Sequence, residues 1–284
     1  MKMPRTAVLF VPGDRPDFFP KAVLSKANTL IFDLEDAVAP AEKENSRFLV
    51  EQALKGQGFG GKELAVRINP LASPWGRDDL SMALRCPGIE AIVLPKAEPS
   101  KVKLAEQLLH NTERRIICLI ETARGLQLVY ETILASPRVE AVMLGAEDLA
   151  AEMNLRRTSG GEEISFARQA LVLAAYAAGV QPIDTPYLQV RDLEGLRLDT
   201  VKAREAGFTA KTAISPRQVS VIREVFRPDP DEVKQAEKIV RAAEEAGRRG
   251  RAVVIVDGAM VDPPVIARAR RVLELAGEEA GNGD

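Results

Sequence analysis

The sequence is poor in the residues on which several common kinds of site depend. Its 284 residues include one histidine and two cysteines. A histidine base and a histidine-rich metal centre are therefore disfavoured, and two cysteines make neither a disulfide framework nor a zinc site. Cys118 stands in an apolar run and is expected in the core, whereas His110, at the end of a helical pattern, is expected at the surface.

Long apolar runs and an excess of charge are also missing. No stretch approaches the ~20 apolar residues of a transmembrane helix, and the N-terminus lacks the apolar segment of a secretory signal. The 39 basic and 41 acidic residues give a formal net charge of -2. So balanced a chain offers no electrostatic basis for nucleic acid or membrane as the main partner. We therefore expect a cytoplasmic protein that acts on small molecules.

Eight short apolar segments, each followed by a helical pattern, organise most of the chain. They cover residues 7–11, 29–32, 63–68, 91–94, 116–120, 141–144, 181–183 and 210–213. Strands that alternate with helices predict a parallel sheet, and eight such units in about 225 residues predict a closed (β/α)8 TIM barrel. An open doubly wound sheet is the alternative, but the phosphate-binding motifs GxGxxG and GxxxxGK[ST] are absent.

Beyond the eighth unit, Pro228 and Pro230 interrupt the pattern. A charged helix, an apolar strand-like run at residues 252–256, the stretch DGAMVDPP and a last helix follow. We therefore expect the barrel over residues 1–227 and a helical extension over residues 228–284. The extension should pack on the barrel or on a neighbouring subunit, or lie across the mouth of the active site.

Acidic and basic residues gather where the predicted strands end, which is where barrel enzymes place their working residues. Such a mixture suits a small anionic substrate bound through a metal ion. The residues at these ends are Arg15, Glu35, Asp36, Arg67, Lys96, Glu98, Glu121, Arg124, Glu147, Asp148, Asp184 and Lys211.

Two neighbouring strands deliver acids to one place, Glu121 after the fifth strand and Asp148 after the sixth. Two bare carboxylates ~4 Å apart repel by ~4 kcal/mol at an effective dielectric constant of 20, so a shared proton or a metal must offset the repulsion. Mg2+ takes one or two carboxylates together with substrate oxygens, and this is the favoured interpretation. The alternative is that both acids cap the helices that follow.

Arg67 lies inside a strand pattern, where a guanidinium needs a carboxylate partner. A substrate carboxylate held by two hydrogen bonds is the favoured partner, and an internal ion pair with Glu35 or Asp36 is the alternative. Lys96 could form a Schiff base, but an ordinary ion pair with Glu98 is favoured.

Eight short motifs stand in order between Val11 and Pro264. They are FVPGDRP, DLEDAV, RINP, LPKAE, IETARG, GAEDLAAEMN, KTAISPRQ and DGAMVDPP. Together they resemble the citrate lyase beta subunit (citryl-CoA lyase) family, within the group of malyl-CoA and citramalyl-CoA lyases related to the HpcH/HpaI aldolases. The resemblance implies Mg2+-dependent cleavage of citryl-CoA, or a related 3-hydroxyacyl-CoA, into an α-keto acid such as oxaloacetate and acetyl-CoA, or the reverse reaction.

The resemblance also implies roles for particular residues. Glu121 and Asp148 would hold the metal, and Arg67 would bind the substrate carboxylate. Together with Glu121, the backbone of three residues would line the keto-acid site. These residues are Gly145, Ala146 and Glu147.

The family resemblance further implies a trimer or hexamer in which an acid of the last motif reaches the neighbouring subunit's site. That acid would be Asp262, with Asp257 less favoured, and it would exchange a proton with the thioester methyl group. Glu35 and Asp36 are second candidates, either as bases or as support for Arg67 and for metal-bound water.

The chain departs from the family pattern on strands seven and eight, where CoA is expected to enter. Ser215 stands where a histidine is common and Thr185 where a glycine is common. Arg15 and Lys211 are candidate CoA contacts, but the identity of the thioester is left open. The alternatives are a stand-alone malyl-CoA or citramalyl-CoA lyase, a thioesterase-like enzyme, and a subunit that binds oxaloacetate and Mg2+ but needs partner chains. A class II aldolase acting on free acids is disfavoured because the only histidine is misplaced.

Overall fold

The computed structural model describes residues 5–56, 58–248 and 253–280. These residues form two compact units that divide between Arg223 and Glu224, within helix α10 (Pro216–Phe226). Within the described ranges, no helix has the length and apolar character needed to cross a membrane.

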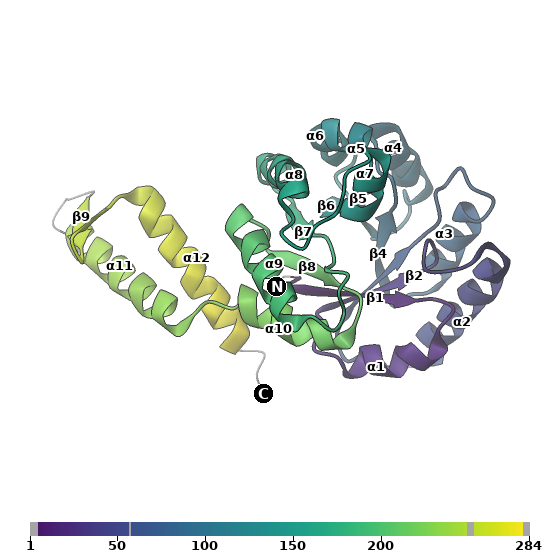
Figure 1. Cartoon of the computed structure of the whole chain (residues 1–284), viewed down its shortest axis with the longest axis horizontal. Helices are drawn as coiled ribbons and strands as arrows, with labels where there is room; N and C mark the ends of the chain where they lie inside the picture. The colour runs from purple at the N-terminus through teal and green to yellow at the C-terminus, as the bar shows by residue number, and fades with distance from the viewer. Residues whose placement is uncertain (1–4, 57, 249–252, 281–284) are drawn as a thin grey trace. The chain divides into compact units, whose positions relative to one another are not determined.

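The first unit is a closed barrel of eight parallel strands in sequential order, with helices around it (Figure 1). The (β/α)8 TIM barrel predicted from the sequence is therefore confirmed, and each predicted strand overlaps an observed one. The strands are β1 (Ala7–Pro12), β2 (Thr29–Asp33), β3 (Glu63–Arg67), β4 (Ile89–Leu94), β5 (Arg115–Ile120), β6 (Val139–Leu144), β7 (Gln181–Asp184) and β8 (Ala210–Ala213).

Helices follow the strands as the hydrophobic periodicity predicts, with short 3-10 turns before some of them. They are η1 (Pro16–Phe18), α1 (Phe19–Leu24), η2 (Pro40–Glu42), α2 (Lys43–Gly56), α3 (Gly76–Arg85), α4 (Pro99–Leu108), α5 (Ala123–Gln127), α6 (Val129–Leu134), α7 (Ala146–Glu152), η3 (Glu162–Ile164), α8 (Ser165–Ala178) and α9 (Leu193–Ala206). The single helix predicted over residues 125–134 is two helices, interrupted at Leu128.

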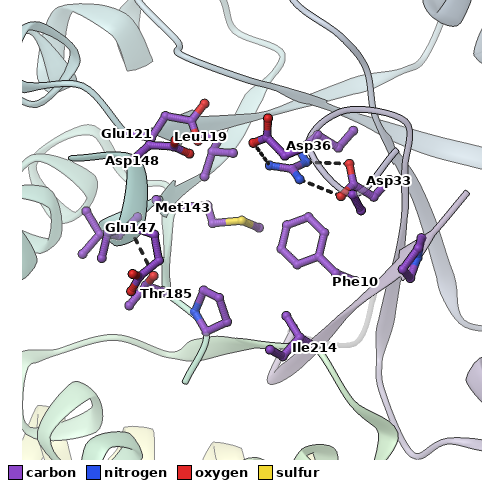
Figure 2. A pocket seen from close by; sticks show the side chains of 17 residues that line it. Phe10, Asp33, Asp36, Leu119, Glu121, Met143, Glu147, Asp148, Thr185 and Ile214 are labelled. Atoms are coloured by element: carbon purple, nitrogen blue, oxygen red, sulfur yellow. Dashed lines mark hydrogen bonds and ion pairs between the residues drawn. The ribbon is translucent and has the colours of Figure 1, made fainter. Parts of the chain in front are cut away.

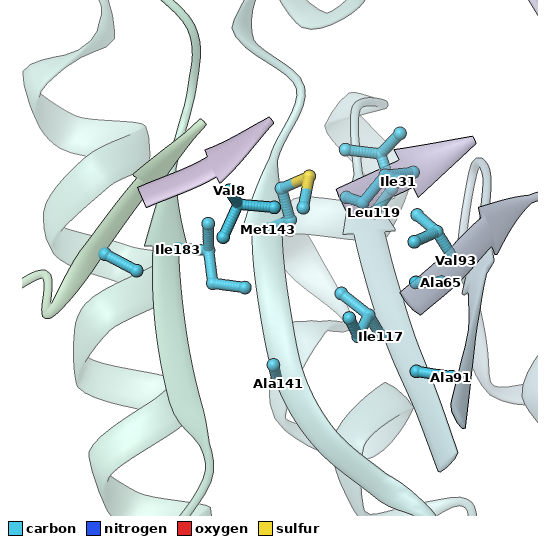
Figure 3. Packing of buried hydrophobic residues seen from close by; sticks show 11 residues of the cluster. Val8, Ile31, Ala65, Ala91, Val93, Ile117, Leu119, Ala141, Met143 and Ile183 are labelled. Atoms are coloured by element: carbon cyan, nitrogen blue, oxygen red, sulfur yellow. The ribbon is translucent and has the colours of Figure 1, made fainter. Parts of the chain in front are cut away.

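The barrel interior is filled by small and branched side chains that alternate with outward-facing ones along each strand. Figure 3 shows this cluster, which contains Val8, Ile31, Ala65, Ala91, Val93, Ile117, Leu119, Ala141, Met143, Ile183 and Ala210. Cys118 lies between two of these positions and is completely buried, as predicted. The interior is thus a packed core that ends just below the C-terminal rim of the strands.

The second unit consists of α11 (Pro230–Arg248), a two-stranded hairpin and α12 (Pro263–Ala280). The hairpin pairs β9 (Val254–Val256) with β10 (Ala259–Val261), and Asp257 and Gly258 turn the chain with positive φ angles of 49° and 80°. The second strand of this hairpin was not predicted. Ala252 and residues 281–284, which the sequence placed in a strand-like run and in a tail, lie outside the described residues.

Candidate active site

A cavity of about 340 Å3 opens at the C-terminal ends of the barrel strands (Figure 2). One side of it carries acidic groups and the other carries an arginine with its own acids, while apolar side chains lie between. The lining residues are Phe10, Pro12, Asp33, Asp36, Ala37, Arg67, Leu119, Glu121, Met143, Leu144, Gly145, Ala146, Glu147, Asp148, Thr185, Pro186 and Ile214.

The strand alternation places Glu121 in this cavity. Glu121 is the next inward position after Leu119 of the core, and Gly145 bears the same relation to Met143. Since Leu119 pairs with Met143, Glu121 and Gly145 face each other one step above the core. A Cβ atom on Gly145 would lie 2.5 Å from Cβ and 2.9 Å from Oε2 of Glu121, so only glycine leaves room for this carboxylate.

Glu121 is 1% exposed, and its charge is poorly compensated by the protein. Burial raises the pKa of Glu121 to about 8, and the charges of Glu35 and Asp148 add to the rise. Its Oε1 accepts a hydrogen bond of 2.8 Å from the backbone N–H of Lys96. Lys96 holds a strained positive φ of 47° at this point, so the backbone is bent to present that N–H.

The helix-capping alternative fails for Glu121, but it holds in part for Asp148, which lies near the positive end of the α7 dipole. Thr122 caps α5 by accepting a hydrogen bond from the Gly125 N–H, so Glu121 does not. Gly145 is the N-cap of α7, and no side chain in this position accepts a hydrogen bond. Asp148 lies in the first turn of α7, exposed to solvent.

The carboxylates of Glu121 and Asp148 lie beside each other in Figure 2, on one wall of the cavity. An uncompensated buried carboxylate beside an accessible one is the oxygen-donor arrangement that Mg2+ accepts. These two side chains would hold the ion, and the remaining coordination positions would be left to water and substrate. Among the described residues, no group of three His, Cys, Asp or Glu side chains stands close enough to hold a metal.

Arg67 stands on the opposite wall, at the next inward position after Ala65 of the core. Its cross-strand partner in the β2–β3 register is Asp33, and the two side chains form a buried ion pair. The Nη1 atom of Arg67 lies 3.0 Å from Glu35 and 3.4 Å from Asp36. The internal ion pair named as an alternative is therefore present, with Asp33 as the main partner.

Glu35 is buried against this arginine. Its Oε2 contacts Arg67 as an ion pair but forms no hydrogen bond in the structure. Burial raises the pKa of Glu35 to about 7. The positive charge of Arg67 lowers the pKa, but burial and the nearby acids Asp36 and Asp33 together outweigh it. Glu35 can therefore exchange a proton near neutral pH.

The loop that carries Glu35 is fixed from behind. The ammonium group of Lys43 donates hydrogen bonds to the carbonyl oxygens of Leu34 and Glu35, at 2.9 and 2.8 Å. The amide of Asn69 donates a third, of 2.7 Å, to Leu34. Trp75, the only tryptophan, lies over the Lys43 ammonium at 5.6 Å. The acids around Arg67 are thus held on a rigid turn.

The backbone of Gly145, Ala146 and Glu147 lines the cavity, but two of its N–H groups are already engaged. That of Gly145 donates to the carbonyl oxygen of Ile120 at 2.8 Å, and that of Ala146 donates to Oγ1 of Thr185 at 3.2 Å. The side chain of Glu147 turns aside and pairs with Arg157 at 2.8 Å.

Lys211 is not available to CoA, and its predicted role is corrected. The side chain is completely buried, and its ammonium lies 2.5 Å from Asp184 and 2.7 Å from Asp199. Arg168 pairs with the same two acids. The sequence placed Lys211 at a strand end but did not indicate that Asp184 of β7 and Asp199 of α9 would pair with it.

Arg15 lies outside the main cavity, exposed and paired with Asp17. Its guanidinium stacks on the ring of Phe18, with Lys21 on the same ring. Phe18 and Lys21 line a second cavity of about 520 Å3, which shares Phe10 and Ile214 with the first. The full lining is Leu9, Phe10, Val11, Phe18, Lys21, Ala22, Val190, Ile214, Ser215, Pro216 and Arg217.

The remaining candidates lie elsewhere. Asp262 belongs to the second unit, where its Oδ1 accepts a hydrogen bond from the N–H of Val265 at the start of α12. His110 is exposed, as predicted. Glu98 pairs with Lys101 and Arg124, so the expected ion pair between Glu98 and Lys96 is wrong.

Sequence reasoning missed Asp33 and Thr185 as residues of the cavity. Asp33 stands in DLEDAV, and aligning the second and third strands by their apolar residues would have placed it opposite Arg67. Thr185 was noted only as a departure from a glycine. Its contact with Ala146 depends on the position of α7, which the sequence does not specify.

Comparison with known proteins found a matching family and several similar chains. The model of the HpcH/HpaI aldolase/citrate lyase family matches residues 6–216. The citrate lyase subunit beta of Leuconostoc mesenteroides subsp. cremoris is 36% identical over 282 residues, covering 96% of this chain and 93% of that protein. The mitochondrial citramalyl-CoA lyase of Rattus norvegicus is 32% identical over 292 residues, covering 96% of this chain and 86% of that protein.

A solved structure is similar along the whole chain. It is that of the protein CitE from Mycobacterium tuberculosis in complex with magnesium, acetoacetate and coenzyme A. The TM-score is 0.83 at 31% sequence identity, and the match covers 98% of this chain and 100% of that chain.

Proposed function

The chain belongs to the HpcH/HpaI aldolase/citrate lyase family, and from the site that it builds we propose that it is a Mg2+-dependent carbon–carbon lyase of the citrate lyase beta subunit type. Its substrate is citryl-CoA or a related 3-hydroxyacyl-CoA, and its products are oxaloacetate or a similar α-keto acid and acetyl-CoA. The observation that carries the proposal is that Glu121 and Asp148 lie across the cavity from Asp33 and Asp36, the acids that pair with Arg67.

Each wall of the cavity has a separate task. Mg2+ held by Glu121 and Asp148 would polarise the oxygen atoms of the keto-acid half as a Lewis acid. Arg67 neutralises a substrate carboxylate through Nη1, since its other nitrogens are engaged with Asp33. The apolar side chains of Phe10 and Met143 lie between the walls and exclude water from the reacting carbons.

In the cleavage direction a base takes the proton of the 3-hydroxyl group, the bond between C2 and C3 breaks, and its electrons pass to the thioester enolate. A proton is then returned to the methyl carbon, which gives acetyl-CoA. Glu35 is a candidate for one of these transfers, because its pKa is raised to about 7. Asp262 is the candidate for the other, supplied by the C-terminal unit of a neighbouring subunit.

The second cavity offers a route for the thioester arm. It continues from the first past Phe10 and Ile214. Lys21 lies on its lining and Arg15 stacks on Phe18 beside it, so both cations could meet phosphates. Since this route is open in a single chain, the proposal favours free CoA as the carrier. We further propose a cytoplasmic homotrimer or hexamer, because the role of Asp262 requires a neighbouring subunit.

The test is turnover by the purified protein with Mg2+ and citryl-CoA, malyl-CoA or citramalyl-CoA, followed by keto-acid release. We expect one of the three to be cleaved, and cleavage to stop with chelator and in Asp148→Asn. Cleavage of citramalyl-CoA or malyl-CoA instead of citryl-CoA would change only the acyl group that we assign to the substrate, and the lyase assignment would stand. Activity that appears only after partner chains are added would favour the non-autonomous subunit, and thioester hydrolysis without carbon–carbon cleavage would contradict the lyase assignment.

A further inference from the structure

A buried chain of contacts joins strands β7 and β8 to the first turn of α7, and no step of the proposed reaction uses it. Thr185 follows β7 and is 1% exposed. Its Oγ1 accepts a hydrogen bond of 3.2 Å from the backbone N–H of Ala146, which is the first residue of α7. Asp148 stands in the same turn, two residues further along.

This contact replaces a missing helix cap. The first N–H groups of a helix have no partner within the helix and need acceptors from outside. The N-cap residue of α7 is Gly145, which has no side chain to supply one. Ala146 is completely buried, so water cannot take the place of the acceptor. Thr185, at the end of the neighbouring strand β7, therefore supplies the hydrogen-bond acceptor that α7 lacks.

Thr185 is in turn fixed from below. The ammonium group of Lys211 donates a hydrogen bond of 2.7 Å to the Thr185 carbonyl oxygen. Lys211 is held in place in the barrel wall by buried ion pairs with Asp184 and Asp199. Arg168 binds both oxygens of Asp184 at 2.9 and 2.8 Å, which closes the network.

We propose that Thr185 is a positioning residue for Asp148. Its hydroxyl group anchors the first turn of α7 to the rigid end of β7, and this sets where the Asp148 carboxylate stands relative to Glu121. The inference rests on the proposed function, because it assumes that Asp148 is a ligand of the metal. It gives a role to Thr185, which stands where the family pattern commonly has a glycine.

The test is a calorimetric titration of the full chain with Mg2+ alone. Thr185→Val keeps the shape and removes the acceptor, and we expect about tenfold weaker Mg2+ binding, in the range for lost partners of metal ligands. Thr185→Ser restores the hydroxyl group and should bind within about twofold of the wild type. Thr132→Val is the matched control, since this threonine of α6 is equally buried but donates to the carbonyl oxygen of Leu128, away from the site.

The melting temperatures separate positioning from general damage. Both valine variants lose a buried hydroxyl group, but only Thr185→Val should lose Mg2+ affinity. Wild-type affinity in folded Thr185→Val, or in Thr185→Ala if the valine variant does not fold, would overturn the inference. So would Thr185→Ser binding as weakly as Thr185→Val. In these cases the loss of binding in Glu121→Gln would leave the proposed function standing, whereas a wild-type protein that does not bind Mg2+ would overturn both.

Discussion

Arg67 and Asp33 face each other across β2 and β3, and the guanidinium donates one hydrogen bond to each carboxylate oxygen, of 2.7 Å from Nε and 2.6 Å from Nη2. This pair fixes the plane of the guanidinium and occupies its two-pronged edge. The edge formed by Nε and Nη2 is therefore not open to a substrate carboxylate. A substrate would bind Arg67 at Nη1, which Glu35 and Asp36 share.

Asp33→Asn should destabilise the protein strongly. Removing one partner of a buried ion pair leaves the other charge uncompensated, at a cost of about 3 kcal/mol or more in the free energy of unfolding. Urea unfolding measures this change. Asp17→Asn breaks the exposed pair with Arg15 and should give no measurable change. Equal stability of the two variants would contradict the assignment of Asp33 as the anchor of Arg67.

Asp36→Asn should strengthen keto-acid binding. Asp36 is half exposed, and its carboxylate lies 3.4 Å from Nη1, the nitrogen of Arg67 that Asp33 does not engage. An exposed ion pair is worth up to about 1 kcal/mol, so its removal should lower the dissociation constant of oxaloacetate by about two- to fivefold. Calorimetry at saturating Mg2+ measures it. Weaker binding in the variant would mean that Asp36 contacts the substrate favourably instead.

Gly145→Ala should weaken Mg2+ binding in a folded protein. The added methyl group would lie 2.5 Å from the Cβ of Glu121, where no real side chain fits, so that carboxylate must move. We expect at least a tenfold weaker affinity for Mg2+. Gly56→Ala, at the end of α2, adds a methyl group with no neighbour within 4 Å and serves as the control. Unchanged affinity in Gly145→Ala would contradict the position of Glu121.

Mg2+ binding should release a proton at neutral pH. In the metal-free protein the pKa of Glu121 is raised to about 8, chiefly by burial, so at pH 7 the carboxyl group is mostly protonated. A metal ligand must be ionised, so Mg2+ displaces that proton. The affinity should therefore rise about tenfold per pH unit towards pH 8 and then level off.

Titrations at pH 7 in two buffers of different ionisation enthalpy measure the proton released.

The raised pKa of Glu121 also affects the stability of the metal-free protein. Its value in the folded protein lies above the unfolded value of 4.5. The group therefore destabilises the metal-free protein progressively as pH rises from about 4.5 to 8. Glu121→Gln removes both effects. A wild-type affinity that does not change between pH 6 and 8 would contradict the assignment.

The barrel could be predicted because its strands are short apolar runs with clear boundaries. Glu121 and Asp148 could be placed together for the same reason, since strands next to each other in the sequence are next to each other in the barrel. The burial and ion pairing of Lys211 could not be predicted from the sequence, because its partner Asp199 comes from the face of a helix whose rotation depends on packing. Charge alone made Lys211 resemble a ligand contact.

The break between α5 and α6 was also hidden, because the apolar period continues across Leu128. The hairpin partner β10 was missed for a different reason. It is only three residues long, and its sequence AMV shows no alternation of apolar and polar residues that would mark a strand. Such features follow from local turn geometry at Asp257 and Gly258 rather than from burial.

The most direct measurement is a calorimetric titration of the purified protein with oxaloacetate, with Mg2+ and again with chelator. Glu121→Gln and Asp148→Asn are the test variants. Glu98→Gln, which removes an acid from the neighbouring strand end outside the cavity, is the control. We expect binding that requires Mg2+, disappears in both test variants and persists in the control. Binding that is absent in the wild type, or that is indifferent to chelator and to both substitutions, would contradict the two-carboxylate metal site.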